Sequence, residues 1–208
     1  PDCAACAAQV LSPAPRIWER TEKHSDFLSL RLGCGDLPLR ADIQYPERRF
    51  TVEEDNLTEA MYRFGERERL VRNVPVCLPL RERFVSGVYA PREERFALAK
   101  SLILQIAARH SYDEVKLAVI YDESDGADFS FVRWLPHTMD NGRTVRYLAT
   151  NADEAKVLSA SLSAVFEYRR GLSESRLSDE LPYFVILCLA QALAAKTECV
   201  RRIQEHKE

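Results

Sequence analysis

The stretch Phe84–His110, FVSGVYAPREERFALAKSLILQIAARH, decides the fold that the sequence predicts. Its first residues are apolar and predict a strand, Gly87 predicts a short turn, and the segment after Pro91 predicts a long helix. Strand, turn and helix in this order form the frame of a phosphate-binding loop, in which the phosphates rest on the helix N-terminus. The apolar residues of the helix recur at core-facing spacing: Phe96, Ala99, Leu102, Ile103 and Ile106.

The residues that give a phosphate-binding loop its chemistry are missing from this frame. A working loop follows G-x-x-x-x-G-K-[ST]. With Gly87 as the first glycine, Arg92 stands at the second glycine, Glu93 at the lysine and Glu94 at the hydroxyl. A triphosphate there would meet like charge, at roughly 4 kcal/mol of repulsion per charge pair for an effective dielectric of about 20. We therefore expect a degenerate loop with a structural role. Its positions are Gly87, Ala90, Pro91, Arg92, Glu93 and Glu94.

The composition is that of an ordinary soluble globular chain. Its 208 residues are enough for a domain with a sizeable core. With 29 Lys and Arg against 32 Asp and Glu, the net charge is −3, which argues against a protein that grips a nucleic-acid backbone. No apolar run of about 18 residues occurs, so we expect no membrane-spanning segment. The chain starts at Pro1 without a recognisable signal peptide, and we interpret it as a piece of something longer.

The second half of the chain predicts alternating strands and helices. Val115–Tyr121 and Tyr183–Leu189 are strongly apolar and predict buried strands. Thr150–Asp153 resembles a capping box and predicts the start of a helix that Gly171 ends. This alternation predicts an α/β fold with a mostly parallel sheet covered by helices on both faces. We also expect helices over 2–11, 56–69 and 129–135, strands over 28–32, 74–80 and 144–149, and a last helix towards the C-terminus.

Six cysteines and four histidines form no recognisable metal or catalytic set. Cys3 and Cys6 form a C-x-x-C, but no second pair or nearby histidines complete a metal site. The histidines have no aspartate or cysteine partner at metal or triad spacing. We therefore predict no metal site and no catalytic residue. The histidines are His24, His110, His137 and His206.

The chain resembles a known family in the order and spacing of four segments. FtsK/SpoIIIE-type translocase motor domains are similar to it in the succession of VKLAVIYDE, WLPHT, YLATNADEAKVLSASLSAVFEYRR and LPYFVIL. The similarity covers roughly Val74 to Leu193. It implies a RecA-like core of the P-loop NTPase type, expected over residues 74–208. An N-terminal helix-and-strand appendage, expected over residues 1–73, would pack on this core.

The N-terminal part resembles a more specific branch of that family. The segment RIWERTEKHSDFLSLRLGCGDLPL looks like the one before the first motor domain of EssC/EccC proteins, the membrane-anchored ATPases of type VII secretion. In the motor family the Walker B strand ends in Asp-Glu, which positions magnesium and the attacking water. The resemblance puts Leu189 and Ala190 at these positions. Asp122 and Glu123 match an earlier strand of the family, and we interpret them as the polar end of that strand.

The resemblance implies a non-catalytic domain without a cofactor of its own, in a bacterial motor protein that uses ATP and magnesium. We expect this fragment to couple or regulate the downstream ATPase domains through protein–protein contacts, at the cytoplasmic face of the cell membrane. Expected partners are the adjacent ATPase domains, the membrane-anchor region of the same protein and other secretion subunits. DNA binding belongs to the wider motor family, and neither nucleic acid nor membrane insertion is expected here. The candidates for an interdomain contact are Trp18, Arg20, Asp26 and Arg31.

Two alternative functions stay open at this point. The first is a weak but active ATPase that uses Arg92 or Lys100 in place of the missing lysine, and turnover lost on changing Arg92 would support it. The second is a fragment of a DNA-translocating motor, which would require salt-dependent DNA binding. The slightly acidic balance argues against the second alternative.

Overall fold

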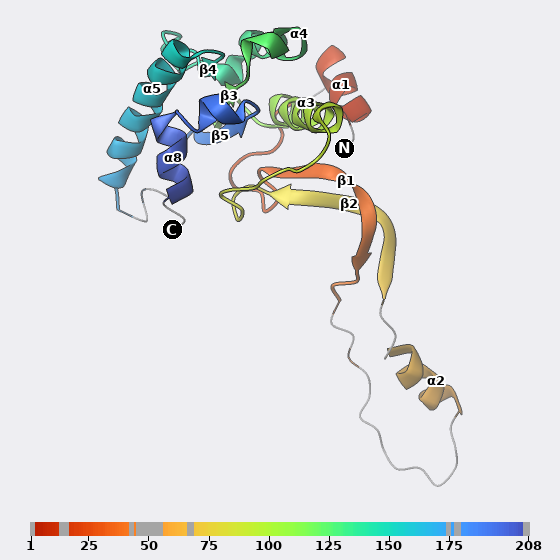
Figure 1. Cartoon of the computed structure of the whole chain (residues 1–208). Coiled ribbons are helices and arrows are strands. Elements are labelled where there is room, and N and C mark those ends of the chain that lie inside the picture. The colour runs from red at the N-terminus through yellow and green to blue at the C-terminus, as the bar shows by residue number, and fades with distance from the viewer. Residues whose placement is uncertain are drawn as a thin grey trace. The chain divides into compact units, whose positions relative to one another are not determined.

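Three parallel strands form the sheet of the computed structural model (Figure 1). Strand β3 (Val115–Ile120) lies between β4 (Leu148–Ala149) and β5 (Tyr183–Cys188). The β3–β5 register runs from Val115 opposite Tyr183 to Ile120 opposite Cys188. The structure describes residues 3–12, 17–41, 44, 56–65, 69–173, 176 and 180–205. His206, one of the four histidines considered above, lies outside these residues.

Strand β3 is buried along its whole length because both faces of the sheet are covered. Its side chains alternate between two apolar clusters, as the period of two in a strand requires. Leu117 and Val119 belong to one cluster, whereas Ala118 and Ile120 belong to the other. The predicted buried strand over residues 115–121 is therefore confirmed, and so is the parallel sheet with helices on both faces.

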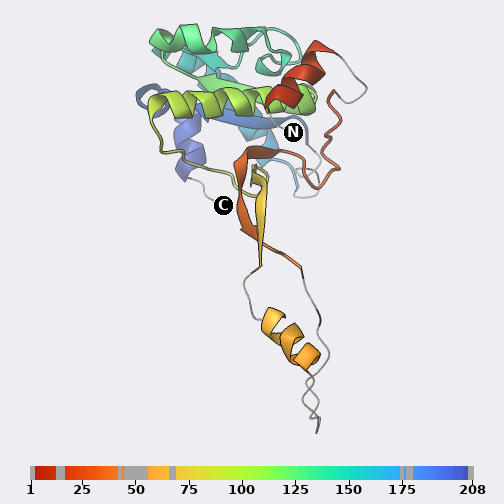
Figure 2. The ribbon, with the colours of Figure 1, turned by 90° about the vertical axis from the view of Figure 1, so that its right-hand side faces the viewer.

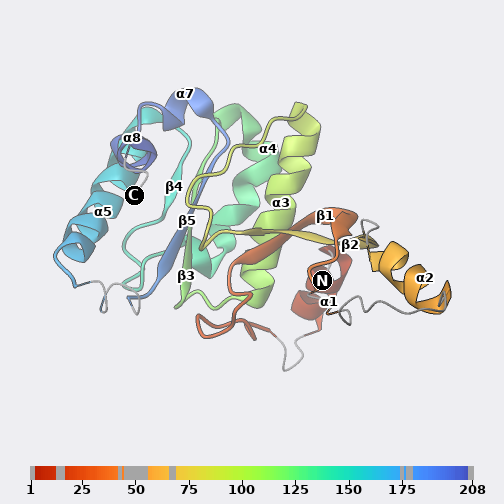
Figure 3. The same ribbon diagram turned by 90° about the horizontal axis from the view of Figure 1, so that it is seen from below.

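Helix α3 (Arg92–Arg109) covers the first face of the sheet (Figure 3). Its predicted apolar stripe is buried, with Ile103 and Ile106 almost fully excluded from solvent. The same cluster takes in Phe27, Leu30 and Phe129. Helix α1 (Cys3–Leu11) packs against α3 from outside the sheet (Figure 2), where the Cys3 Sγ lies 3.0 Å from the Ser101 Oγ. The two residues of the C-x-x-C thus lie on a helix that packs against α3.

Helices α5 (Ala152–Arg170) and α8 (Glu198–Glu205) cover the second face of the sheet (Figure 3). Leu158 and Leu162 of α5 are fully buried there. A short helix, α7 (Gln191–Ala194), connects β5 to α8. The Cys199 N–H donates to the Ser159 hydroxyl at 3.1 Å, which ties α8 to the middle of α5.

Short helical turns connect β3 to β4 on the first face. They are η1 (Glu123–Asp125), α4 (Gly126–Phe129), η2 (Ser130–Trp134) and η3 (Pro136–Thr138). The strand predicted over residues 144–149 is shorter than expected, because β4 has only two residues. Asp140 explains the difference: its Oδ1 accepts the N–H groups of Thr144 and Val145, both at 2.7 Å, and holds this segment in a turn.

The chain divides into two compact units, residues 1–31 with 78–208, and residues 32–77. The second unit contains α2 (Asn56–Gly65) and most of two strands, β1 (Ser29–Pro38) and β2 (Leu70–Pro79). These strands pair antiparallel, since Leu80 N–H bonds to Leu28 O at one end and Leu39 N–H to Arg69 O at the other. The boundary suggested between residues 73 and 74 stays a prediction.

Candidate functional site

The segment predicted as the strand of a phosphate-binding loop has no regular structure. Between Pro79, the last residue of β2, and Arg92, the first of α3, the chain forms turns and an exposed irregular stretch. The Phe84 side chain is 82% exposed and Tyr89 is fully exposed. Among the described residues, no glycine adopts a positive φ, so Gly87 shows no conformation reserved for glycine. The strand predicted before Gly87 was wrong, whereas the helix after Pro91 is confirmed.

The first turn of α3 carries the two carboxylates that the sequence placed there. Pro91 is the N-cap residue and has no side-chain cap hydrogen bond, and Glu93 and Glu94 follow it within the first turn. Both glutamates are exposed. Their charges complement the partial positive charge of the helix N-terminus, so this end of α3 is stabilised without a bound anion.

The two cations considered as substitutes for the missing lysine are paired with aspartates. Arg92 forms an ion pair with Asp125 of η1, and the Lys100 Nζ lies 2.6 Å from the Asp128 Oδ1 of α4. The hydrogen bond from Lys100 holds the pKa of Asp128 below its usual value, and the hydrogen bond to Asp125 raises the pKa of Arg92. Both cations are therefore paired with carboxylates of this chain.

Two aromatic rings in edge-to-face contact support these ion pairs. Phe96 of α3 and Phe129 of α4 meet edge to face, with ring centroids 4.8 Å apart. The Arg92 guanidinium lies 4.4 Å from the centroid of Phe96, and the Lys100 Nζ lies 5.6 Å from that of Phe129. Cations favour the faces of aromatic rings, so the pairs and the rings hold the start of α3 and the η1–α4 segment together.

The Walker B positions lie at the end of β5 but carry no metal-binding group. The backbone N–H groups of Leu189 and Ala190 both donate to the Ile120 carbonyl, at 2.8 and 3.2 Å. Their side chains are apolar and offer magnesium no ligand. Asp122, at the end of β3, caps η1 instead, because its Oδ1 accepts from the Ser124 N–H at 3.0 Å and from the Ser124 hydroxyl at 2.8 Å. These bonds lower the pKa of Asp122, the backbone one most strongly.

Helix α5 begins shortly after the end of β4, and neighbouring side chains cap its N-terminus. The Asn151 Oδ1 accepts the N–H groups of Asp153 and Glu154, at 3.1 and 3.0 Å. In return, the Glu154 Oε2 accepts the Thr150 N–H and hydroxyl, both at 2.8 Å. The helix start predicted over Thr150–Asp153 is confirmed, but the reciprocal cap lies one residue later, between Asn151 and Glu154. It takes up donors that an anion would otherwise bind.

The four residues proposed for an interdomain contact make contacts within the first unit. The Trp18 indole donates to the Ala107 carbonyl at 3.0 Å, and its ring meets Tyr112 edge to face. Arg20 pairs with Asp26 at 2.8 Å. Gln105 of α3 bonds both backbone groups of Arg31, at 2.8 and 2.9 Å. These contacts fasten the segment before β1 and the beginning of β1 to α3. The part of the four residues in an interdomain contact stays a prediction.

Two buried histidines join the end of α3 to its surroundings. The His110 Nε2 accepts the Leu28 N–H at 3.1 Å, and the His137 Nε2 lies 2.8 Å from the His110 carbonyl. Burial lowers the pKa of both imidazoles, so both are neutral near pH 7. Within the described residues, no three His, Cys, Asp or Glu side chains are gathered closely enough to hold a metal ion.

Sequence reasoning missed Asp125, Asp128 and Gln105 at this site. Asp125 and Asp128 lie three residues apart in a helical segment, opposite the two cations on α3. Their spacing was the available signal, but the pairing depends on the tertiary position of the η1–α4 segment. The sequence gives no sign of the role of Gln105, because its partners are the backbone N–H and C=O of Arg31, a residue distant in the chain.

Comparison with known proteins gives relatives over most of the chain. The chain is 27% identical over 203 residues to the ESX secretion system protein EccC of Geobacillus thermodenitrificans, which covers 96% of the chain. It is 26% identical over 172 residues to the type VII secretion system protein EssC of Staphylococcus aureus, covering 82% of the chain. The chain is a homologue of the EccC/EssC secretion proteins.

The match to EccC/EssC proteins concerns a small part of their length. A third relative is the EccC of Thermomonospora curvata, which is 27% identical over 86% of the chain. The chain spans 14% of the length of each of the two EccC proteins and 12% of the Staphylococcus EssC. No protein-family model matches the chain. None of the helices that the structure describes is long and apolar enough to cross a membrane.

Proposed function

We propose that this chain is a non-catalytic, ATPase-like domain of a type VII secretion motor, with a degenerate RecA-like core. It couples or regulates neighbouring ATPase domains of the same protein through protein–protein contacts. This proposal places the domain at the cytoplasmic face of the bacterial membrane, beside the membrane-anchor region and other secretion subunits. It requires no nucleotide or metal in the domain itself.

The pairing of Arg92 with Asp125 and of Lys100 with Asp128 carries this proposal. A nucleotide site needs cations that are free to meet phosphates, and these two are already neutralised by aspartates. Glu93 and Glu94 add two further negative charges at the helix start. Near contact, each such charge would repel a phosphate oxygen by roughly 4 kcal/mol at an effective dielectric of about 20.

The altered Walker B positions support the proposal independently. Leu189 and Ala190 follow β5 directly and use their backbone N–H groups to cap the Ile120 carbonyl. Phosphoryl transfer requires groups that hold magnesium and orient the nucleophile. The residues at the loop positions and those at the Walker B positions differ from a working site in chemically unrelated ways. Either difference alone would prevent hydrolysis.

Calorimetric titration with ATP and magnesium tests the proposal. We expect no binding heat from the 208-residue chain. The comparison is the double variant Glu93→Lys/Glu94→Ser, which restores the lysine and the hydroxyl of the loop. Its matched control is Glu82→Lys/Asp113→Ser, which changes the net charge equally at two exposed positions. Binding by the loop variant alone would mean that the frame persists without its chemistry.

Other results of this titration have equally definite meanings. Micromolar binding by the parent chain would refute the proposal and favour an active ATPase, and turnover lost on changing Arg92 would then identify its cation. Silence from all three proteins would mean that the frame itself has changed, and would leave protein contacts as the function. Salt-dependent DNA binding by the parent would favour the translocase alternative.

A further inference from the structure

A segment distant in the chain caps the last turn of α3. The final four carbonyls of an α-helix have no partner within the helix. The His110 N–H bonds to the first of them, that of Ile106, at 3.0 Å. Residues 18–20 provide donors for the other three: the Trp18 indole bonds to Ala107, the Trp18 N–H to Ala108 and the Arg20 N–H to Arg109, at 3.0, 3.2 and 3.0 Å. All four carbonyls are therefore satisfied by groups of this chain.

This segment, residues 18–26, has bonds of its own, and we call it the strap. The Arg20 guanidinium pairs with Asp26 at 2.8 Å. The Thr21 N–H donates to the His24 Nδ1 at 3.1 Å, and the His24 N–H donates in return to the Thr21 carbonyl at 3.0 Å. Most residues of the strap are exposed, whereas Phe27, which follows it, is buried. A loop that is bonded internally and lies at the surface can leave its neighbours without losing its own shape.

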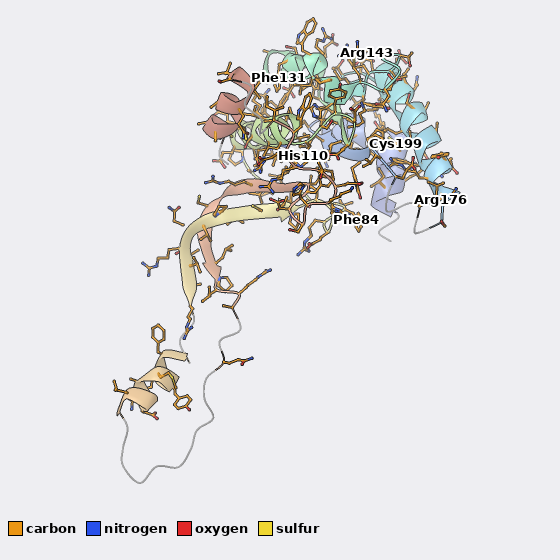
Figure 4. The ribbon with its side chains drawn as sticks, turned by 180° about the vertical axis from the view of Figure 1, so that it is seen from behind. Phe84, His110, Phe131, Arg143, Arg176 and Cys199 are labelled. Carbon is orange, nitrogen blue, oxygen red and sulfur yellow. The ribbon has the colours of Figure 1, made fainter. Side chains whose placement is uncertain are left out.

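Two bulky residues in a left-handed backbone conformation mark the ends of this region. Trp18 has a φ of 55° and Leu28 a φ of 56°. This conformation is unfavourable for bulky residues and persists only where the surroundings impose it. Leu28 is held firmly: its side chain is 3% exposed, its carbonyl accepts the Leu80 N–H at 3.0 Å, and its N–H donates to the Nε2 of His110, labelled in Figure 4, at 3.1 Å. Trp18 is 38% exposed, so its strained backbone is held at the surface.

We propose that the strap is an autoinhibitory contact that opens as a unit, leaving α3 while Leu28 stays in place. Opening breaks the three bonds to α3 and the ion pair of Glu19 with Arg109, at 3.5 Å, and it relieves the strained backbone of Trp18. The bonds within the strap are kept. This inference rests on the proposed function, for which it names the regulation. The closed strap keeps Trp18 and Arg20 engaged with α3, and the open strap frees both for a contact with a neighbouring ATPase domain.

Amide hydrogen exchange of the 208-residue chain tests the proposal without any variant. The amides of Trp18 and Arg20 should share one opening equilibrium, with protection factors within about threefold of each other. The Leu28 amide should be protected at least about tenfold more strongly, because it stays bonded to His110. The amide of Ile106, inside α3, should be protected at least as well as that of Leu28.

A pair of substitutions at Trp18 tests whether the strain belongs to the closed strap. Trp18→Gly and Trp18→Ala both remove the indole, but only glycine adopts a positive φ without strain. The Arg20 amide should therefore be at least about threefold better protected in Trp18→Gly than in Trp18→Ala. Ser25→Gly and Ser25→Ala are the matched control, since Ser25 is exposed in the strap and has no positive φ. There glycine should give no better protection than alanine.

Three outcomes would overturn the inference. Protection of the Leu28 amide less than about tenfold above that of the strap would mean that the strap has no opening of its own. Protection factors of Trp18 and Arg20 that differ by more than about threefold would mean that it does not open as a unit. Equal protection of Arg20 in the two Trp18 variants would mean that the closed strap stores no strain.

Exchange in the parent chain decides the matter even if the Trp18 variants fail to fold. ATP plays no part in these experiments, so their failure is distinguishable from failure of the proposed function.

Discussion

Burial of His110 makes the stability of this protein depend on pH. The side chain is 2% exposed at the end of α3, and its ring meets Phe27 edge to face with centroids 5.2 Å apart. Its Nε2 accepts the Leu28 N–H, so the proton of the neutral ring is on Nδ1. Burial lowers the pKa of His110 from 6.5 to about 4. The charge of Arg109 adds to this lowering, whereas the Ile106 backbone and Asp26 oppose it.

The sign of the effect follows from which state binds the proton more readily. Between pH 6.5 and 4 the unfolded chain is protonated at His110 while the folded chain is not, so acid favours unfolding. The difference of about 2.5 between the two pKa values corresponds to ~3.4 kcal/mol when the pH falls below both. From pH 7.5 to pH 5, the same two pKa values give a loss of about 2 kcal/mol.

Urea unfolding at pH 7.5 and pH 5 measures this loss, with His110→Gln as the comparison. Glutamine has an oxygen that can still accept the Leu28 N–H, but it does not titrate. We expect the parent to lose about 2 kcal/mol more than the variant over this range. Glu114 and His137 also have displaced pKa values, but they are present in both proteins and largely cancel in the difference. An equal loss in both proteins would refute the assignment to His110.

Two further predictions concern stability at constant pH. Phe129→Ala removes a fully buried ring that packs against α3 and should lower the free energy of unfolding by about 3–5 kcal/mol, measured by urea unfolding. Phe131→Ala, at an exposed neighbouring position, should cost well under half of that. Similar losses in both variants would contradict the packing of Phe129. Asn151→Ala removes the cap of α5 and should cost about 1 kcal/mol, while Asn141→Ala in an exposed loop should change the stability by less than about 0.5 kcal/mol. A loss of stability in the loop variant alone would contradict the capping role.

The predictions from sequence succeeded where a segment carries its own pattern. Strand β3, strand β5 and helices α3 and α5 were recognisable because their apolar periodicity, caps and glycine stop signals are local. The capping box at Thr150–Glu154 is an example, since every group it joins lies within five residues. The Cβ periodicity of α3 likewise determined which of its residues are buried.

Features that depend on a partner distant in the chain could not be read in this way. The segment before Gly87 is apolar like a strand, but a strand forms only where a neighbouring backbone takes up its hydrogen bonds. The ion pairs of Arg92 and Lys100 depend on where the η1–α4 segment folds back onto α3. In these pairs the positive charges of Arg92 and Lys100 are neutralised by Asp125 and Asp128.

The way in which residues 32–77 leave and rejoin the first unit has a consequence for how the protein can change. The chain crosses between the units along two paired antiparallel strands, β1 and β2, so the entry and exit of this insertion are neighbours. The entropic cost of closing such an insertion grows only logarithmically, by about 0.6 kcal/mol for each doubling of its length. The insertion is therefore a module that can be lengthened, shortened or exchanged at little cost to folding. The length of this insertion can therefore vary while the sheet and its helices stay as they are.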